Sequence, residues 1–409
     1  MKKILFVINT LGRAGAETAL LGLIAHLDPT VYEISLYVLM EQGELISKLP
    51  AHVKVENDRF SSVSVLSKNG SSAMKKRVLR AAFSNNSLWR NIFPMLRILF
   101  EMIRKKRMQP DKLLWRLISD GAKRLPQEYD LAVAYIEGGS TYYVADHVDA
   151  KKKAAFVHIA YQQAGYTRRM DQGAYRKIDA IYAVSDEVKE HFDRFYPEHT
   201  HKTEVFHNLL DTDSMLRLSK EPGGFTDTKK GLRLLTVGRL THQKGYDVAI
   251  EAMRLIHEKH PTLRWYVLGD GDKRKDLESQ IKQAGLEDFF ILLGATNNPY
   301  PYYAQADVYV HCTRFEGKSI AIQEARFFNL PIIASNCDGN REQIQDGIDG
   351  ILCDLTPQAI SDAVRKICEE ASVRERLRSA VSLDARDESK DLDKLLGLID
   401  TSDNKKKGA

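Results

Sequence analysis

The chain has 409 residues, a length typical of two or three domains. Apolar residues make up 43% and charged residues 28%, which excludes disordered, collagen-like and coiled-coil proteins, while the net charge of +5 selects no partner by itself. No apolar stretch is long enough to span a membrane, and the short apolar start predicts no signal peptide. Four cysteines lie at wide spacings without a metal-ligand pattern: Cys312, Cys337, Cys353 and Cys368. We therefore expect a reduced, cytosolic protein.

The first half alternates short apolar runs with helical patterns, which is typical of βαβ units and a parallel sheet. The first run, 3–8, leads through a turn with Gly15 into a helix predicted at 16–27. Glycine allows close approach of a ligand and the start of a helix can bind phosphate, so Gly15 is a candidate ligand residue; a merely structural turn is the alternative. The other predicted strands are 33–38, 131–135, 154–159, 180–184 and 204–206. Together they predict a Rossmann-like domain over 1–213.

A basic segment at 59–124 interrupts this domain. It holds sixteen Lys or Arg against three acidic residues, a net +13, so the rest of the chain is acidic. Ile92, Leu96, Leu99 and Ile103 recur at helical spacing, which predicts amphipathic helices. Such helices can lie on an anionic membrane surface. The alternatives are an apolar face that packs on the domain, or nucleic acid, which the absence of a recognisable binding motif disfavours.

The second half predicts a complete doubly wound domain over 231–385. Its predicted strands are 232–237, 264–268, 289–293, 308–311, 332–334 and 351–353, and its predicted helices are 246–258, 273–283, 318–328 and 357–370. Segment 214–230, with Glu-Pro-Gly-Gly, is predicted as the linker between the domains. A C-terminal helix is expected at 386–401 and a disordered tail at 402–409. The expected fold class is α/β, with two Rossmann-like domains facing a central cleft.

Two cations follow the first strand of this second domain. Arg239 leaves the carboxyl end of the strand and Lys244 lies five residues later, directly before a helix. Arginine can bind a diphosphate in a bidentate manner and lysine as a point charge, so the pair is a candidate diphosphate site. There is no dinucleotide-binding glycine motif and no P-loop lysine, which argues against a dehydrogenase or a P-loop NTPase.

A pair of carboxylates gives the most specific pattern. Glu316 follows a strand and Glu324 lies in the next helix, which places the two up to about 12 Å apart at about 1.5 Å per residue. The backbone N–H groups of Gly317, Lys318, Ser319 and Ile320 lie between them in the chain. This spacing fits a sugar nucleotide, with one carboxylate at the hexose and one at the ribose. A helix-start carboxylate plus a surface glutamate is the alternative.

With these motifs the chain resembles glycosyltransferase family 4, retaining enzymes of the GT-B fold, along nearly its whole length. The resemblance implies that Glu316 contacts the donor sugar, Glu324 binds the ribose, and Arg239 and Lys244 hold the diphosphate. The segment Gly-Ala-Thr-Asn-Asn-Pro at 294–299 corresponds to the place that receives the base, which makes Ala295 a candidate.

The N-terminal domain also carries the resemblance. Tyr-Ile-Glu-Gly-Gly at 135–139, followed by Phe-Val-His at 156–158, is similar to domains of enzymes that build bacterial surface polysaccharides, which implies a role for His158 at the reaction centre. Segment 205–211 is similar to the family's crossover turn, except that Leu209 replaces glycine.

The expected function is a retaining hexosyltransferase with His158 and Glu316 as catalytic residues. The expected donor is a UDP-sugar and the expected acceptor a membrane-associated, lipid-linked glycan. No metal and no nucleic acid are expected, although Asp-Thr-Asp at 211–213 matches a metal motif in letters. The protein is expected in the cytoplasm, peripheral at the inner face of the cell membrane. The alternatives are a sugar-nucleotide epimerase and a catalytically silent subunit that binds a membrane or a partner.

Overall fold

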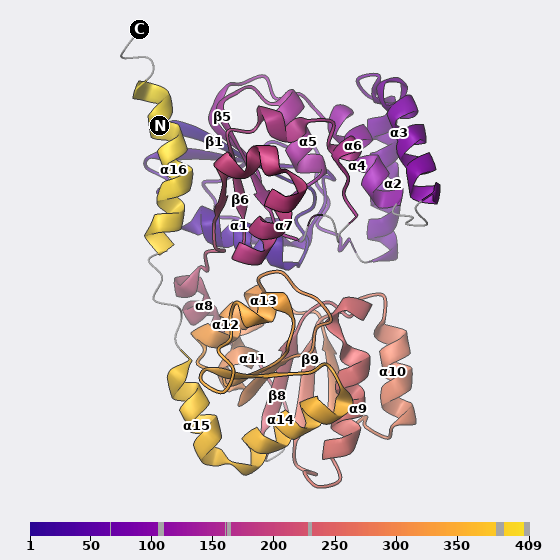
Figure 1. Cartoon of the computed structure of the whole chain (residues 1–409), viewed down its shortest axis with the longest axis vertical. Coiled ribbons are helices and arrows are strands. Elements are labelled where there is room, and N and C mark those ends of the chain that lie inside the picture. Colours follow the sequence, from indigo (N-terminus) through magenta and orange to yellow (C-terminus); the bar gives the residue numbers. More distant parts are fainter. Residues whose placement is uncertain are drawn as a thin grey trace. The chain divides into compact units, whose positions relative to one another are not determined.

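The structure is a computed structural model that describes residues 1–65, 67–104, 110–159, 161, 165–227, 231–381 and 388–404. The chain divides into two compact units (Figure 1). The first is Met1–Leu209 together with Asp387–Ala409, and the second is Leu210–Arg386. Both are parallel sheets covered by helices, so the prediction of two Rossmann-like α/β domains is confirmed. No helix in the described ranges has the length and apolar character needed to cross a bilayer.

Within the described residues the first unit holds a seven-stranded sheet in the order β3-β2-β1-β4-β5-β6-β7. The residues Ile4 to Ile8 of β1 are fully buried, as expected for a central parallel strand with helices on both faces. The strands are β1 Lys2–Ile8, β2 Tyr32–Val38, β3 Lys54–Val55, β4 Tyr129–Ala134, β5 Ala150–Val157, β6 Ala180–Ala183 and β7 Thr203–Val205. Outside the basic segment, the α-helices in the part of this unit before residue 210 are α1 Gly15–Ala25, α5 Gly139–His147, α6 Arg168–Asp171 and α7 Asp186–Phe195. The two-residue strand β3 was not predicted.

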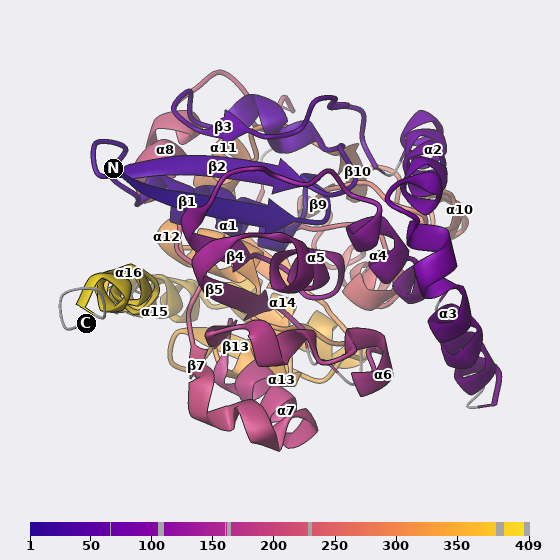
Figure 2. The same cartoon turned by 90° about the horizontal axis from the view of Figure 1, so that it is seen from above.

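The basic segment is helical, as predicted, and forms three helices between β3 and β4: α2 Lys68–Phe83, α3 Ser87–Arg104 and α4 Pro110–Asp120. Their number was not predicted. Its residues 66 and 105–109, with three of its basic side chains, lie outside the described residues. Buried Arg116 on α4 anchors the helices, since its guanidinium lies 2.5 Å from Asp146 and 4.0 Å from the ring centre of Tyr142. A Cβ added to Gly139 would lie 2.7 Å from the Trp115 ring, so α4 packs on the turn after β4. In Figures 1 and 2, α3 lies farther from the sheet than α4.

In the second unit the described residues form a six-stranded sheet in the order β10-β9-β8-β11-β12-β13. The strand order reverses between β8 and β11, as it does between β1 and β4 in the first unit, and ligands of such sheets bind at the carboxyl ends there. The strands are β8 Arg233–Val237, β9 Arg264–Leu268, β10 Phe290–Gly294, β11 Val308–His311, β12 Ile332–Ser335 and β13 Gly350–Cys353. The helices are α8 Thr212–Ser219, α9 Tyr246–Ile256, α10 Arg274–Gln283, α11 Tyr300–Gln305, α12 Ile320–Phe327, α13 Asp338–Arg341, α14 Pro357–Glu369 and α15 Ala371–Ala380.

The predicted linker at 214–230 is wrong in its first part, because Thr212–Ser219 form α8 of the second unit. The Asp211 side chain accepts a hydrogen bond from the Ser214 N–H and so caps this helix. Asn298 ties α8 to the unit, since its Nδ2 donates to the Leu218 carbonyl at 2.8 Å. Residues 228–230 of the predicted linker lie outside the described residues.

The C-terminal helix α16, Glu388–Asn404, belongs to the first unit. The Tyr182 hydroxyl donates to the Lys394 carbonyl at 2.8 Å, and Asp391 Oδ2 lies 3.1 Å from Nδ1 of His207. A helix near 386–401 was predicted, but its return to the first unit was not. Residues 402–404 lie in α16 and not in a disordered tail, and residues 405–409 lie outside the described residues.

Candidate functional site

Three side chains of the second unit meet where β8 and β11 end. Lys244 closes the short helix η4, His242–Lys244, and its ammonium contacts a carboxylate oxygen of Glu316 in the loop after β11. Buried His311 ends β11, and its Nε2 lies 3.3 Å from the same oxygen. The structure therefore brings together Lys244 and Glu316, two residues predicted from sequence. It adds His311, which was not predicted as a site residue. The one feature of the sequence that could have indicated it is its position at the end of a strand.

The charge state of this cluster follows from its contacts. Burial alone would raise the pKa of Glu316, but the Lys244 ammonium and the His311 ring outweigh burial and lower that pKa to about 2. Burial, aided by the charge of Lys244, lowers the pKa of His311, so its ring is neutral near pH 7. Glu316 is therefore ionised across the physiological range, with a cation and a neutral ring on one of its oxygens.

Two glycines allow the backbone around this cluster to approach closely. Gly245 has a φ of +62°, and a Cβ there would lie 2.4 Å from the carbonyl oxygen of Cys312. A Cβ on Gly339, near the start of α13, would lie 2.0 Å from the Gly317 carbonyl oxygen. Both distances are shorter than any non-bonded carbon contact allows. The loop that carries Glu316 is thus packed against η4 on one side and α13 on the other.

Glu324 occupies a different environment on α12. It is buried, and the Tyr303 hydroxyl donates to its Oε2 at 2.9 Å. Burial raises the pKa of Glu324 to about 7, although hydrogen bonds from Tyr303 and Tyr300 lower it in part. The carboxyl is therefore close to half ionised at neutral pH, which makes it sensitive to any ligand that donates hydrogen bonds. Neither tyrosine was predicted as a site residue; both belong to an aromatic run at 300–303.

The remaining predicted residues of this unit also lie at the carboxyl edge of the sheet. Arg239 follows β8 and is exposed, and its side chain has no ion-pair or hydrogen-bond partner among the described residues. Ala295 follows β10 and is exposed. Ser319 precedes α12 but forms no side-chain cap, so it leaves the N–H groups of the helix that begins at Ile320 to other acceptors. Residues 317–318 are partly buried in the preceding loop. What these residues bind stays a prediction.

In the first unit, His158 follows β5 and is partly buried. Its Nε2 lies 2.9 Å from the carbonyl oxygen of Tyr135, and because a carbonyl oxygen only accepts, Nε2 carries the proton. Burial lowers the pKa of His158 to about 4, so the ring is neutral at pH 7. Its Nδ1 therefore carries a lone pair that can accept a hydrogen bond.

Two residues to which the sequence analysis assigned no role hold this region together. Glu137, after β4, is buried, and its Oε2 accepts a hydrogen bond of 3.0 Å from the His158 backbone N–H. Burial raises the pKa of Glu137. Asn9, after β1, donates to the Glu137 carbonyl at 3.2 Å and accepts from the Ser140 N–H at 2.9 Å. These hydrogen bonds join the loops after β1, β4 and β5. In the sequence, the feature that Asn9 and Glu137 share is a polar side chain just beyond a strand.

Gly15 is the first residue of α1, one position before the helix start predicted at 16. Glu17 in the same turn is buried, and its Oε1 accepts a hydrogen bond from the Thr10 hydroxyl at 3.1 Å. A carboxylate in the first turn already stabilises the positive end of the helix dipole, which weakens the case for a phosphate there. Close approach of a neutral group to Gly15 remains compatible with the geometry. The ligand role of Gly15 stays a prediction.

Residues 222–382 match the family model for glycosyl transferases group 1. One relative is an N-acetylgalactosaminyltransferase of Campylobacter jejuni that acts on a diphospho-undecaprenol glycan, 26% identical over 54% of this chain and 58% of that protein. Another is the amylovoran biosynthesis glycosyltransferase AmsD of Erwinia amylovora, 32% identical over 31% of this chain and 35% of that protein. Each match thus spans less than two thirds of the relative's length.

Among solved structures, HepE of Anabaena in complex with UDP is similar over 100% of both chains, with a TM-score of 0.65 at 17% identity. At that identity the likeness concerns the fold. The fold and the site thus define a two-domain protein of the GT-B class. The family match concerns the second unit, since residues 222–382 lie within Leu210–Arg386 and match the model for glycosyl transferases group 1.

Proposed function

We propose that the chain transfers a hexose from a nucleotide-diphosphate sugar to a membrane-associated, lipid-linked glycan, with retention of the anomeric configuration. The observation that carries this proposal is the contact of Lys244 and His311 with Glu316, at the strand-order reversal of a glycosyl transferases group 1 domain. A cation and a carboxylate side by side can serve the two parts of such a donor, the diphosphate and the sugar hydroxyls.

In the proposed reaction the bond between the anomeric carbon and the diphosphate oxygen breaks, and the acceptor oxygen bonds to that carbon. The acceptor proton leaves with the nucleoside diphosphate. Arg239, Lys244 and the N–H groups at the start of α12 stabilise the negative charge on the leaving group, a task that needs no metal. The diphosphate draws Lys244 away from Glu316, and Glu316 then accepts hydrogen bonds from the sugar hydroxyls. Glu324 accepts from the ribose, and backbone groups near Ala295 receive the base.

In the first unit, His158 is proposed to contact the transferred sugar. Its neutral ring, with Nε2 bound to the Tyr135 carbonyl, offers the Nδ1 lone pair to a sugar hydroxyl. Glu137 acts as a positioning residue, because it holds the backbone of His158. The first unit is proposed to bind the acceptor.

The donor nucleotide and the acceptor are proposed from the relatives. HepE was solved with UDP and with UDP-glucose, which supports a UDP-sugar. The Campylobacter relative acts on a diphospho-undecaprenol glycan, and AmsD takes part in amylovoran biosynthesis, which supports a lipid-linked acceptor in cell-surface polysaccharide synthesis. With such an acceptor the protein would work in the cytoplasm, peripheral at the inner face of the cell membrane.

The test is a thermal-shift screen with UDP-, GDP- and ADP-sugars, with and without EDTA, followed by product analysis. A ligand that binds the folded state raises apparent stability by RT ln(1 + [L]/Kd), so one donor should shift the midpoint selectively, and EDTA should not abolish the shift. Transfer to a lipid-linked glycan extract should then release the nucleoside diphosphate. Isomerised donor without acceptor would mean an epimerase, and donor binding without transfer or hydrolysis would mean a silent subunit.

A further inference from the structure

The outer face of α3 carries large apolar side chains that contact little of the described chain. They recur three or four residues apart, which places them on an arc of about 80° at about 100° per residue. With their exposed fractions they are Trp89 (76%), Phe93 (74%), Leu96 (56%), Phe100 (70%) and Ile103 (59%). We call these five residues the α3 stripe. Such a continuous apolar stripe on a protein surface marks an interaction site.

The opposite face fixes how α3 is turned. At its start, the Ser87 hydroxyl donates to the Leu117 carbonyl at 2.7 Å, and Asn91 Nδ2 donates to Asp120 at 2.7 Å. Farther along, Ile98 and Met102 are buried in one cluster with residues of α4 and α6. Since this inner face is apolar and packed, α3 cannot rotate to bury the stripe without exposing an equal apolar surface. The apolar residues that recur at helical spacing in the sequence span the boundary between the two faces of α3. Ile92 and Leu99 are half-buried, whereas Leu96 and Ile103 are exposed.

Arginines line one edge of the α3 stripe. Arg90, Arg97 and Arg104 are seven residues apart and exposed, so they form a row along the helix. Arg97 and Arg104 have no carboxylate partner among the described residues. A row of cations beside an apolar stripe is complementary to the anionic headgroups and acyl chains of a bilayer. A contact between two copies through this face would instead bring like charges into the same interface.

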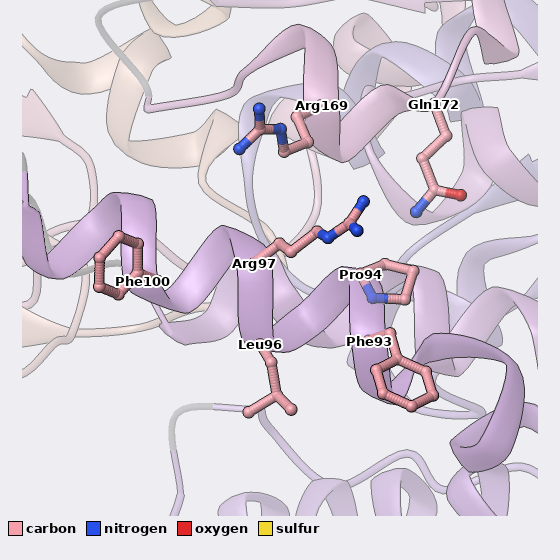
Figure 3. Close-up of a pocket in the computed structure, with 7 residues that line it drawn as sticks. All are labelled: Phe93, Pro94, Leu96, Arg97, Phe100, Arg169 and Gln172. Atoms are coloured by element: carbon pink, nitrogen blue, oxygen red, sulfur yellow. The ribbon is translucent and has the colours of Figure 1, made fainter.

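A groove of about 740 Å³ adjoins the arginine edge. Phe93, Pro94, Leu96, Arg97 and Phe100 of α3 form one side, and Arg169 and Gln172, at α6, form the other. Figure 3 shows the side chains of Arg97 and Arg169 in the space between the two elements, with Gln172 beyond them. The groove thus joins apolar walls to two guanidinium groups, which matches a phosphate ester attached to a hydrocarbon chain.

We propose that α3 docks on an anionic lipid bilayer, with the α3 stripe at the acyl boundary and one lipid phosphate in the groove at Arg97 and Arg169. The aromatic rings supply apolar burial at the interface, and the arginine row binds headgroups. This deepens the membrane-associated acceptor of the proposed function by naming the surface that meets the membrane. The docking itself requires no sugar transfer.

The test is flotation of the full chain with vesicles of phosphatidylglycerol and phosphatidylcholine in equal parts, against phosphatidylcholine alone. The wild type should float with the mixed vesicles only. The double variant Phe93→Ser/Phe100→Ser should lose at least tenfold in partitioning, and the matched control Leu255→Ser, an exposed apolar residue on α9, should not. All variants change exposed side chains, and unchanged thermal midpoints check that they fold.

A second pair of variants distinguishes phosphate binding in the groove from general electrostatic attraction between the arginine row and the anionic membrane. Arg97→Gln and Arg104→Gln remove the same charge from the same row, but only Arg97 lines the groove. Arg97→Gln should lower partitioning at least threefold more than Arg104→Gln. Equal losses for the two variants would overturn lipid-phosphate binding in the groove. Release of the protein from vesicles by inorganic phosphate, beyond the effect of chloride at equal ionic strength, would also overturn it, because the groove would then be a site for free phosphate.

Two outcomes overturn the docking surface. The first is wild-type flotation of the double phenylalanine variant. The second is a wild-type dimer in sedimentation that this variant converts to a monomer, without vesicle binding, since a second copy would then cover the stripe. The donor-induced thermal shift, measured on the same proteins, keeps the proposals apart. A normal shift without flotation removes only the docking, and flotation without any donor shift removes only the proposed transferase function.

Discussion

The two units share one strand order up to the sixth strand but differ in the chemistry at their strand ends. In the second unit this edge carries charge, with an ionised Glu316 beside Lys244 and a Glu324 whose pKa lies at about 7. In the first unit the corresponding edge holds a neutral His158 whose pKa is about 4 and a buried Glu137. The same topology thus sets where polar side chains gather, while the loops decide whether those side chains are charged or neutral. The following predictions test this contrast, from the largest effect to the smallest.

The charged edge is tested by Lys244→Met. The variant removes the cation proposed for the diphosphate and leaves Glu316 without its main counter-charge, so kcat/KM for transfer should fall about 100-fold or more. Initial rates with the donor found in the thermal-shift screen measure this. The control is Lys273→Met, which removes a lysine paired with Asp276 on the surface of the same unit. Near-normal rates for Lys244→Met would show that charge at this edge does not drive the reaction.

The neutral edge is tested by His158→Phe, which keeps a ring but removes both nitrogens. The transfer rate should fall about ten- to a hundredfold, because the variant loses one hydrogen bond that strengthens as charge develops in the transition state. Donor affinity should change little. Because the pKa of His158 is about 4, the wild-type rate should show no inflection from this residue between pH 5 and pH 8. His26→Gln, an exposed histidine beyond α1, is the control. A wild-type inflection near pH 6.5 that His158→Phe abolishes would refute the neutral assignment.

Glu324 should make donor binding depend on pH. The ribose hydroxyls should bind the ionised carboxyl, and burial raises the pKa of this carboxyl to about 7 in the free protein. Donor affinity should therefore rise about tenfold per pH unit between pH 5 and pH 7, and then level off. Binding should release a proton below pH 7, which calorimetry in buffers of different ionisation enthalpy detects. Glu324→Gln should bind about five- to a hundredfold more weakly at pH 8, with a flat profile. A variant that keeps the wild-type pH dependence would remove Glu324 from the donor site.

The smallest expected effect concerns α16, which follows the second unit in the chain but belongs to the first. Burial would raise the pKa of Asp391, but hydrogen bonds from His207 and Lys394 outweigh it and lower the pKa to about 2. A lowered carboxyl pKa stabilises the fold above pH 4, and this contribution is lost as the pH falls toward 2. Asp391→Asn should lower the free energy of unfolding by about 1–2 kcal/mol at pH 7 in urea titrations. Asp393→Asn, exposed on the same helix, should change little, and equal effects would exclude the specific contact.

Much of this molecule could be predicted from local patterns. The strands at 264–268 and 308–311 agree with β9 and β11, because a run of buried apolar residues between turns leaves few alternatives. Lys244 and Glu316 were found because each follows a strand, and strand ends of a parallel sheet converge. Asn9, His311 and Tyr303 were missed, since a single polar residue after a strand or within an aromatic run has many structural explanations.

The sequence by itself determined the two Rossmann-like units, the helical insertion and the strand-end positions of the candidate site residues. These depend on periodicity and chain order, which are local properties. Only the tertiary structure decided that His311 meets Glu316, that Glu324 is buried among tyrosines, that α16 returns to the first unit and that the α3 stripe faces outward. Each of these depends on burial and on contacts between residues distant in the chain, and a helix with apolar residues on two faces does not itself specify which face will be packed.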